Sequence, residues 1–479
     1  MNETNAAGAA RAEDHAQGFD AEAAIARHVA ASRYEDLPAE AVERVKTFVL
    51  DTLGVGLAGT SDGNAARVTA AASRWGGGME ATLWGSGAQL PAPSAAFVNA
   101  YHIHCLEYDC IHERAVVHPM ATLLPALFAW CERAARQGRC VDGRRFITAV
   151  AVGVDIAGLV GSATSSGLRF FRPATAGGLG AAAALASAAG LDAEQTAHTL
   201  AIHCGQISGT MQAHVEGSPT LGLQIGVNAR AAICALDLAE AGLTGPRAFL
   251  TGPFGYFALF ENGSFDPAVI ERELGAVRQI LRVSHKPFPT GRLSHAGVDG
   301  MRRLIAAHGF APEAVAEVTV HVPPLVMRLM GRPDIANPTS NHAKLCLPFV
   351  IGTFLARGRV DVPDFGSPEM LNDPAVHAFA ARVHLAPDDN PDQNAIAPQR
   401  IVVRLNDGDT REITIRAIYG HPDAPLTEAE NRDKFSRNVS FARPPRAPDA
   451  CARIMDFVAG LDKADDVSLL PPLLAARRH

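Results

Sequence analysis

Along the first 280 residues apolar side chains recur at helical spacing, and no stretch alternates with a period of two. One such segment begins at Pro38, which suits an early helical position, and continues with Val42, Val45 and Phe48 on one face. Similar helical patterns cover residues 120–135, 146–159, 193–207 and 222–238. The sequence therefore predicts an all-helical domain over residues 19–284.

After residue 285 the pattern changes to a mixture of helices and strands. Helices are expected at 295–307 and 341–357, strands at 318–322 and 381–385, and a hairpin at 401–418 that turns at Asp407-Gly408. Residues 285–420 are therefore expected to form an α+β unit of about four strands and two helices.

The C-terminal residues 421–479 return to helical patterns, one opening near Thr427 and one covering residues 450–461. We expect this tail to pack back on the first helical unit. The predicted fold is then mainly α, with residues 19–284 and 421–479 forming one domain and the α+β unit inserted as a lid. Residues 1–18 lack the apolar run of a signal peptide and are expected to be a disordered tail.

Composition argues against several classes of function. The net charge is −7 without a long basic run, so nucleic-acid binding has no support. The uncharged stretch from Pro173 to Leu191 is mostly Ala and Gly, which favours a closely packed buried helix over a membrane span. The eight cysteines form neither a C-x-x-C pair nor a disulfide framework, so we expect a cytoplasmic protein.

Residues 101–119, YHIHCLEYDCIHERAVVHP, hold four histidines and two acids within nineteen positions. A metal site is one interpretation, because His102-x-His104 and His112-Glu113 could supply ligands. No H-E-x-x-H or similar spacing occurs, so we expect no metal. For His102 and His112 a structural role is the stronger interpretation.

His118 differs from these histidines because His118-Pro119 directly precedes a long apolar helix, with Glu107 and Asp109 close in sequence. A histidine beside an acid and a helix start has a tunable pKa, which suits general acid–base chemistry. His118 is therefore the candidate proton-transfer group.

A second candidate segment, SHKPFPTGRLSH, covers residues 284–295 at the expected domain junction, where pockets are common. Lys286 and Arg292 could bind a multiply charged carboxylate. A solvated basic linker is the alternative, against which the two stiffening prolines and Phe288 count. Arg172, just before the Ala/Gly-rich helix, could also receive a carboxylate or could be an ordinary surface arginine.

Several stretches, in order and spacing, resemble the MmgE/PrpD family, whose members include 2-methylcitrate dehydratase, cis-aconitate decarboxylase and iminodisuccinate epimerase. The stretches that carry the resemblance are VLDTLGVGLAG at 49–59, AFVNA at 96–100, the histidine-rich 101–119, KPFP at 286–289 with His295, AKL at 343–345, YGHPDAPLT at 419–427 and KF at 434–435. The resemblance implies a helical domain completed by the C-terminal tail, an inserted α+β lid, a homodimer, and a reaction that uses no metal or organic cofactor.

The family's loop H-x-L-D-[FY]-D-D-T is similar to this chain from His104 to Asp109, with Glu107 in place of the first Asp. Cys110 and Ile111 depart from the last two positions, and the loop is one residue longer before His118. Lys286 matches the lysine of the family's K-x-[FY]-P segment. The resemblance therefore transfers His118, Lys286 and Asp109 as the catalytic set.

Other family positions differ in this chain. Arg172-Pro-Ala stands where decarboxylase and dehydratase members resemble one another in H-P-T, and the other departures are Leu221, Gln224, Gly291 and Leu329. These departures indicate a pocket rebuilt for another anion, with Arg172 as a fixed positive charge.

The predicted function is a cofactor-independent lyase that removes the α-proton of a small di- or tricarboxylic acid and catalyses elimination or hydration. His118 would transfer the proton, Lys286 would stabilise charge and Asp109 would orient His118. The remaining expected site residues, which would contact or support the bound polycarboxylate, are Glu107, Arg172, Gln224, Thr290, Arg292 and His295. The alternatives are an isomerase or epimerase of a dicarboxylic acid, and a catalytically silent ligand-binding member.

Overall fold

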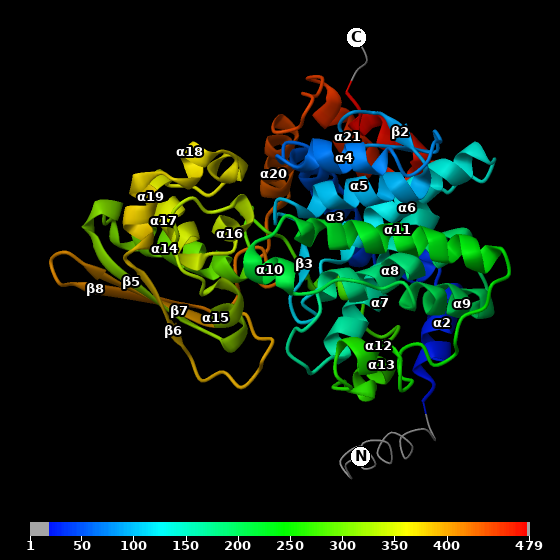
Figure 1. Cartoon of the computed structure of the whole chain (residues 1–479), viewed down its shortest axis with the longest axis horizontal. Helices are drawn as coiled ribbons and strands as arrows, with labels where there is room; N and C mark the ends of the chain where they lie inside the picture. Colours follow the sequence, from blue (N-terminus) through cyan, green and yellow to red (C-terminus); the bar gives the residue numbers. More distant parts are fainter. Residues whose placement is uncertain (1–18, 477–479) are drawn as a thin grey trace.

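The structure is a computed structural model that describes residues 19–476, so the tail expected at 1–18 lies outside the described residues. The N-terminal part is mainly helical (Figure 1). Its helices are α2 (Ala21–Ala31), α3 (Ala39–Gly59), α4 (Ala65–Ala72), α5 (Ala92–His104), α6 (Pro119–Arg136), α7 (Gly143–Ala163), α8 (Arg172–Ala189), α9 (Ala193–Cys204), α10 (Gln212–Glu216), α11 (Thr220–Glu240), α12 (Tyr256–Phe260) and α13 (Pro267–Glu273). The five helices predicted in this part are confirmed, although α9 ends at Cys204 rather than at residue 207.

The Ala/Gly-rich stretch forms α8, which is buried along almost its whole length between α6, α7 and α11. Close packing against α7 depends on two glycines. A Cβ on Gly153 would lie 2.7 Å from the carbonyl oxygen of Gly180, and a Cβ on Gly180 would lie 2.5 Å from that of Gly153. The prediction of a buried helix here is confirmed.

Among the described helices, α7 and α11 are long and apolar enough to cross a membrane by length and composition. The most apolar window of α7 is 100% buried inside the protein, and that of α11 is 61% buried. Burial of this kind is typical of core helices, so length and composition alone are weak evidence for a membrane span here.

The expectation that residues up to 280 contain only helices was wrong in detail, because short strands occur there. Strands β1 (Ala81–Thr82) and β2 (Gln89–Leu90) pair with each other, and β3 (Ile111–His112) pairs antiparallel with β4 (Val283–Ser284). Two-residue strands are too short to produce an alternating pattern, so sequence periodicity could not reveal them.

A four-stranded sheet follows, with the order β6-β5-β7-β8. Its strands are β5 (Val315–Val322), β6 (Val383–Pro387), β7 (Gln399–Leu405) and β8 (Thr410–Ile415); β5 is parallel to β6, and the other pairs are antiparallel. The four predicted strands are confirmed. In Figure 1 the sheet and its helices lie beside the helical part.

The helices of this second part are more numerous than the two predicted. They are α14 (His295–His308), α15 (Pro324–Met330), α16 (Ser340–Lys344), α17 (Leu347–Arg357), α18 (Pro368–Leu371) and α19 (Pro374–Ala380). The helix expected at 341–357 is divided into α16 and α17 because Pro348, in the first turn of α17, cannot continue the preceding helix. Helix α14 packs against β7 and β8, which buries one face of the sheet.

The C-terminal helices α20 (Glu428–Ser440) and α21 (Ala450–Ala459) pack against α3, as the sequence predicted. The contact is close because Phe435 lies directly over Gly54, where an added Cβ would be 2.8 Å from its ring. Lys434 forms a buried ion pair with Asp51 of α3 at 2.6 Å. The fold is thus mainly helical with a small C-terminal sheet.

Candidate active site

The two segments singled out in the sequence meet at the β3–β4 pair. Ile111 pairs with Ser284 and His112 with Val283, which brings the loop after α5 against the chain that leads to Lys286. The hydroxyl of Tyr108 donates to the carbonyl of Pro287 at 3.2 Å. The ammonium of Lys434 donates to the carbonyl of Tyr108 at 3.2 Å, so the C-terminal helix α20 also holds this loop.

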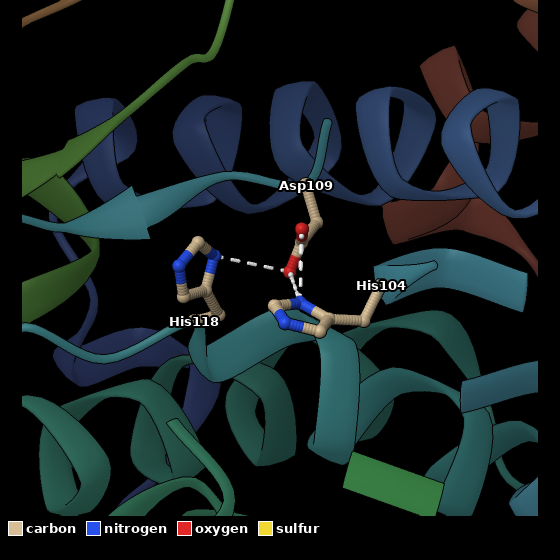
Figure 2. Close-up of side chains that lie close together, drawn as sticks. All are labelled: His104, Asp109 and His118. Atoms are coloured by element: carbon tan, nitrogen blue, oxygen red, sulfur yellow. Dashed lines mark hydrogen bonds and ion pairs between the residues drawn. The ribbon is translucent and has the colours of Figure 1, made fainter. Parts of the chain in front are cut away.

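Two histidines share one carboxylate at the centre of this region (Figure 2). The Nδ1 of His104 lies 3.0 Å from Asp109 Oδ2, and the Nδ1 of His118 lies 3.1 Å from the same oxygen. His104 is the last residue of α5, and His118 is the N-cap residue of α6, as predicted. All three side chains are buried, with Asp109 at 0% exposure.

The shared acid does not leave the two rings equivalent. Burial lowers the pKa of His118 below its usual value, and Asp109 only partly offsets this effect. For His104, burial is outweighed by the charges of Asp109 and Glu107, so its pKa is raised. Although burial opposes ionisation, the two histidines hold the pKa of Asp109 well below its usual value. The site therefore favours a carboxylate at Asp109 and holds a proton more readily on His104 than on His118.

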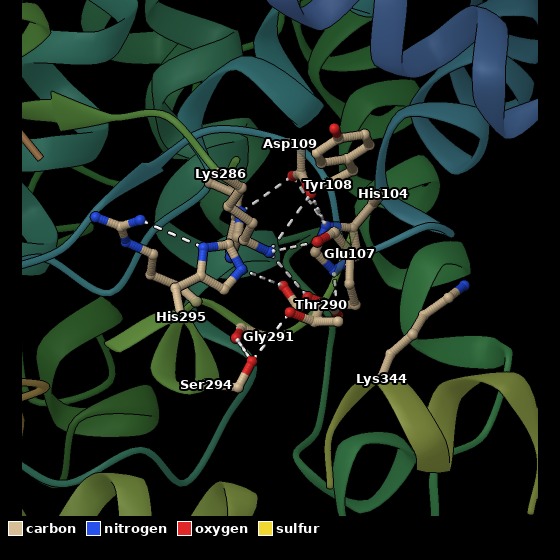
Figure 3. A network of polar contacts seen from close by, with 12 residues as sticks. His104, Glu107, Tyr108, Asp109, Lys286, Thr290, Gly291, Ser294, His295 and Lys344 are labelled. Atoms are coloured by element: carbon tan, nitrogen blue, oxygen red, sulfur yellow. Dashed lines mark hydrogen bonds and ion pairs between the residues drawn. The ribbon is translucent and has the colours of Figure 1, made fainter. Parts of the chain in front are cut away.

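Lys286 lies on the other side of the same carboxylate (Figure 3). Its ammonium donates to Glu107 Oε2 at 3.0 Å and to the Glu107 carbonyl at 3.2 Å, and lies 4.0 Å from Asp109 Oδ1. Burial opposes ionisation of Glu107, but Lys286 and His104 lower its pKa to about 2. Lysine, histidines and acids thus form one charged network.

Backbone strain is concentrated at this site. Four described residues other than glycine have positive φ, and two of them are asparagines, which tolerate it. The other two are Glu107 at 53° and Val116 at 52°, and both line the cavity next to His118. Such strain persists where surrounding contacts fix the chain, and it is frequent at functional sites.

A cavity opens beside this network between the helical part and the sheet part. Its polar and charged lining residues are His104, Glu107, His118, His214, Lys286 and Arg292; its apolar wall comes from Ile111, Val116, Leu168, Phe171, Pro173, Met211, Leu293, Leu329, Met330 and Leu345, with Gly291. The cavity is narrow, because the centre of a water molecule can occupy only about 50 Å³ of it. His118 and Lys286 therefore line one narrow cavity.

Arg172 and Gln224, expected to bind substrate, do not line this cavity. The guanidinium of Arg172 is buried against Glu261, with Nε and Nη2 donating to its two carboxylate oxygens at 3.0 Å each. Gln224 is bonded to the backbone of Thr210 and lies at a separate surface hollow. The fixed charge of Arg172 is thus neutralised inside the protein.

The residues of segment 290–295 that were expected to bind substrate mostly contact other groups of the protein. Arg292 lines the cavity, but it forms an ion pair with Glu113 at 2.7 Å and donates to the carbonyl of Tyr419 at 2.7 Å. The hydroxyl of Thr290 lies 2.9 Å from that of Ser294 (Figure 3). His295 Nε2 lies 3.3 Å from the Thr290 carbonyl, and neither Thr290 nor His295 lines the cavity.

His112 behaves as the structural interpretation expected. Its Nε2 lies 2.9 Å from Gln279 Oε1, and its Nδ1 accepts from the backbone N–H of Ala115 at 3.2 Å. His102 is also buried and does not line the cavity.

Sequence reasoning missed two histidines of the cavity. His104 was matched to the family loop without a role, although its spacing of five residues from Asp109 was visible. His214 lies in the five-residue helix α10, whose surroundings carry no recognisable pattern. The structure brings it to the cavity that His104 and His118 also line.

His104, Asp109 and His118 are also a donor set that could hold a metal, because one ligand atom from each lies within 4.8 Å of the others. The set offers only three protein ligands. The ammonium of Lys286, 4.0 Å from Asp109 Oδ1, would repel a divalent cation. Proton sharing accounts for the same geometry without that repulsion, so the absence of a resident metal remains our prediction.

Comparison with known proteins gives two matches to family models. The model of the MmgE/PrpD N-terminal domain matches residues 23–268, and that of the MmgE/PrpD C-terminal domain matches residues 288–458. The resemblance stated from the sequence is therefore confirmed.

Relatives include three cis-aconitate decarboxylases. The protein from Mus musculus is 29% identical over 447 residues, which cover 90% of this chain and 89% of the relative. The protein from Homo sapiens is 28% identical over 450 residues, covering 90% of each chain. The protein from Aspergillus terreus is 24% identical over 462 residues, covering 92% of this chain and 93% of the relative.

Proposed function

Because the chain belongs to the MmgE/PrpD family, we propose that it is a lyase that acts on a small tri- or dicarboxylic acid by proton transfer at the carbon next to a carboxylate. Relatives that span nine-tenths of the chain and are named cis-aconitate decarboxylase support the lyase class and a tricarboxylate substrate. The reaction that we favour is elimination of water from a β-hydroxy acid, or its reverse.

The observation that carries this proposal is the sharing of Asp109 by His104 and His118 beside Lys286. Asp109 fixes the Nδ1 side of His118, so that a neutral His118 carries its proton there and presents a free Nε2. A neutral base and a protonated acid a few ångströms apart match the requirement of an elimination, in which one proton leaves carbon and another is given to oxygen.

The proposed reaction has one proton-abstraction step and one leaving-group step. His118 Nε2 accepts the proton of the α-carbon, and the electron pair of the broken C–H bond becomes the double bond. The bond from the β-carbon to the hydroxyl breaks, and that oxygen receives a proton from His104 and leaves as water. The products are the unsaturated acid and water, and a proton passed through solvent restores both histidines.

Lys286 has the role of stabilising charge in this proposal. Removal of the α-proton places negative charge on the neighbouring carboxylate, and a fixed ammonium beside that oxygen lowers the barrier. Lys286 already contacts Glu107 at 3.0 Å, so the substrate carboxylate would share this ammonium with Glu107. Arg172 and Arg292 have protein carboxylates as partners, and the proposal gives neither of them the main substrate contact.

The small volume of the cavity adds a conformational requirement. A tricarboxylate does not fit in about 50 Å³ of solvent-accessible space, since small-molecule pockets are typically about 300–1,000 Å³. We therefore propose that the part of the chain carrying the sheet moves as a lid over the helical part. Closure would exclude water from the charged network and strengthen its electrostatic effects.

A second candidate is decarboxylation of cis-aconitate, which the names of the relatives favour. In that reaction His104 would protonate a carbon atom while the carbon–carboxylate bond breaks and carbon dioxide leaves. Leucine at position 329, which lines the cavity where the family pattern has tyrosine, counts against an unchanged pocket.

The experiment is a panel of di- and tricarboxylates, which includes citrate, 2-methylcitrate and cis-aconitate, incubated with the enzyme in deuterated water. Proton NMR separates the outcomes. Elimination yields an alkene, decarboxylation yields carbon dioxide and a shorter acid, and epimerisation exchanges the α-hydrogen without an alkene. Absence of turnover for every acid, with the protein folded by circular dichroism, would contradict the proposal.

A further inference from the structure

The cavity has a polar lining residue that the mechanism above does not use. His214 belongs to α10, the short helix between the helical part and the sheet part (Figure 1), and its ring lines the cavity. Its charge environment includes Glu107 and His104, which also line that cavity. His214 therefore lies at the same cavity as the catalytic network.

The segment around His214 is held by side chains of the sheet part. Arg332, Thr339 and Asn341 donate to the backbone carbonyls of His214, Gly217 and Ser218 at 3.0, 3.1 and 3.0 Å. These three bonds all reach backbone atoms, so they position the segment whatever side chains it carries. His214 is thus placed in the cavity only while the two parts of the chain are in contact.

Arg332 also sets the hydrogen-bonding state of the His214 ring. Its Nη2 lies 3.4 Å from His214 Nδ1, and the same nitrogen donates to the carbonyls of His214 at 3.0 Å and Leu329 at 3.2 Å. An arginine can only donate, so in this contact, the longest of the three, Nδ1 accepts and the proton of the neutral ring is on Nε2. Burial and the charge of Arg332 together lower the pKa of His214 to about 4, which keeps the ring neutral near pH 7.

Arg332 differs from Arg172 and Arg292. Arg172 and Arg292 form ion pairs with Glu261 and Glu113. Within residues 19–476, no carboxylate lies within ion-pair distance of Arg332, and its buried Nε and Nη1 have no hydrogen-bond partner. The donors of Arg332 are therefore directed at the His214 segment rather than at a protein carboxylate.

We propose that His214, held by Arg332 with its Nε2–H towards the cavity, donates a hydrogen bond to a carboxylate of the bound polycarboxylate in the cavity that His118 also lines. His118 and His214 then have opposite tautomers and opposite roles. His118 carries its proton on the Asp109 side and accepts from the ligand, whereas His214 accepts from Arg332 and donates to the ligand. His214 is a specificity-determining residue and Arg332 a positioning residue. The inference rests on the proposed function, because it assumes a polycarboxylate in this cavity.

The test measures binding of tricarballylate, a saturated tricarboxylate, by calorimetry and turnover of the best acid from the panel. His214→Leu is expected to weaken tricarballylate binding roughly 10- to 100-fold, the value of one hydrogen bond to a charged group. It should raise KM by a similar factor and change kcat by less than about threefold, since the contact is the same in the ground and transition states. His214→Gln, whose amide can donate from a similar position, should recover most of the affinity.

Arg332→Gln tests the positioning role. It should weaken binding less than His214→Leu does, and the double variant should bind like His214→Leu alone, because Arg332 acts through the ring. His342→Leu is the matched control, since that ring is bonded to the Pro333 carbonyl and does not line the cavity. Additive effects of Arg332→Gln and His214→Leu would overturn the positioning role.

The failures of the inference and of the proposed function are distinguishable. If the native enzyme converts a tricarboxylate while His214→Leu binds tricarballylate as tightly as the native enzyme does, the inference is wrong and the proposed function stands. If the native enzyme neither binds tricarballylate nor converts any acid of the panel, the proposed function fails and the inference fails with it. Melting temperatures of all variants identify those that do not fold.

Discussion

The two walls of the cavity are built on different principles. One wall carries His104 and His118 around the shared carboxylate of Asp109, with both Nδ1 atoms 3.0–3.1 Å from its Oδ2 and with Lys286 beside it. The wall contributed by α10 and α15 is mostly apolar and has a single neutral imidazole, His214. On the first wall each ionisable group shifts the pKa of another. On the second wall the shape of the apolar surface and the single imidazole are the features that a ligand meets.

This difference assigns separate tasks to the two walls. A coupled network of acids and bases can move protons, and its geometry tolerates little change. An apolar wall cannot stabilise developing charge, but it selects ligands by fit, because each methylene changes the binding free energy. Chemistry is therefore expected to depend on the wall with His104, His118 and Lys286, and substrate choice on the wall from α10 and α15.

The largest effect is expected from loss of the proposed base. His118→Gln should lower kcat roughly 10²- to 10⁴-fold, the usual contribution of a positioned general base, with little change in KM. Initial rates of the best acid from the panel measure this effect. His112→Gln is the control, because that ring lies in the same loop but contacts Gln279 rather than the cavity. If His118→Gln turns over at the native rate, the division of tasks between the walls is wrong.

The next effect concerns stability rather than catalysis. Arg172→Leu should lower the free energy of unfolding by about 3–5 kcal/mol, because it leaves the buried Glu261 without its cation. Urea denaturation measures the loss, and the double variant Arg172→Leu with Glu261→Leu should recover most of it. Since Arg172 does not line the cavity, kcat per folded molecule should remain near the native value. A loss of kcat beyond tenfold in the folded variant would show that Arg172 does contribute to catalysis.

The rate should depend on pH in a bell-shaped manner. The pKa of His118 is lowered, so the base is lost only when the pH falls below the usual histidine value of 6.5, and the rate then drops about tenfold per pH unit. The pKa of His104 is raised, so the acid is lost only as the pH rises above 6.5. Because His104 and His118 share Asp109, the apparent pKa values of the two limbs of the pH–rate profile belong to the pair of histidines and not to either one alone.

Asp109→Asn sharpens this pH prediction. Asp109 raises the pKa of both histidines, so its removal should move both limbs of the pH–rate profile to lower pH. The profile of kcat/KM measures the shift. Limbs that stay at their native positions in this variant would show that the titrating groups are not this pair.

Prediction from sequence succeeded where the physical cause is local. His118 lies nine residues from Asp109 in one loop, and its place before Pro119 marks a helix start, so a tunable histidine was visible in the chain itself. Long helices and four strands were visible for the same reason, since their apolar period extends over many residues. The division of the helix at 341–357 also had a local signal in Pro348, which the prediction did not use.

Prediction failed where a residue's role is decided by a distant partner. The charge of Arg172 is neutralised by Glu261, 89 residues away, in a segment without a recognisable pattern. The charge of Arg292 is likewise neutralised by an ion pair with Glu113. A cation beside a predicted pocket looks like a ligand-binding group until its carboxylate partner is known, and only the folded chain supplies that partner.

The smallest expected effect tests the apolar wall. Leu329→Val removes one methylene from the wall in α15 and leaves the charged network unchanged, so kcat should stay within about twofold of the native value. The enlarged wall should shift the ratio of kcat/KM for 2-methylcitrate over citrate upward by no more than about tenfold, the lower end of what one methylene contributes to selectivity. Leu325→Val is the matched control, since Leu325 is buried on the same helix but does not line the cavity. A selectivity change as large in Leu325→Val as in Leu329→Val would mean that the helix moves as a whole, and that fit at this wall does not choose the substrate.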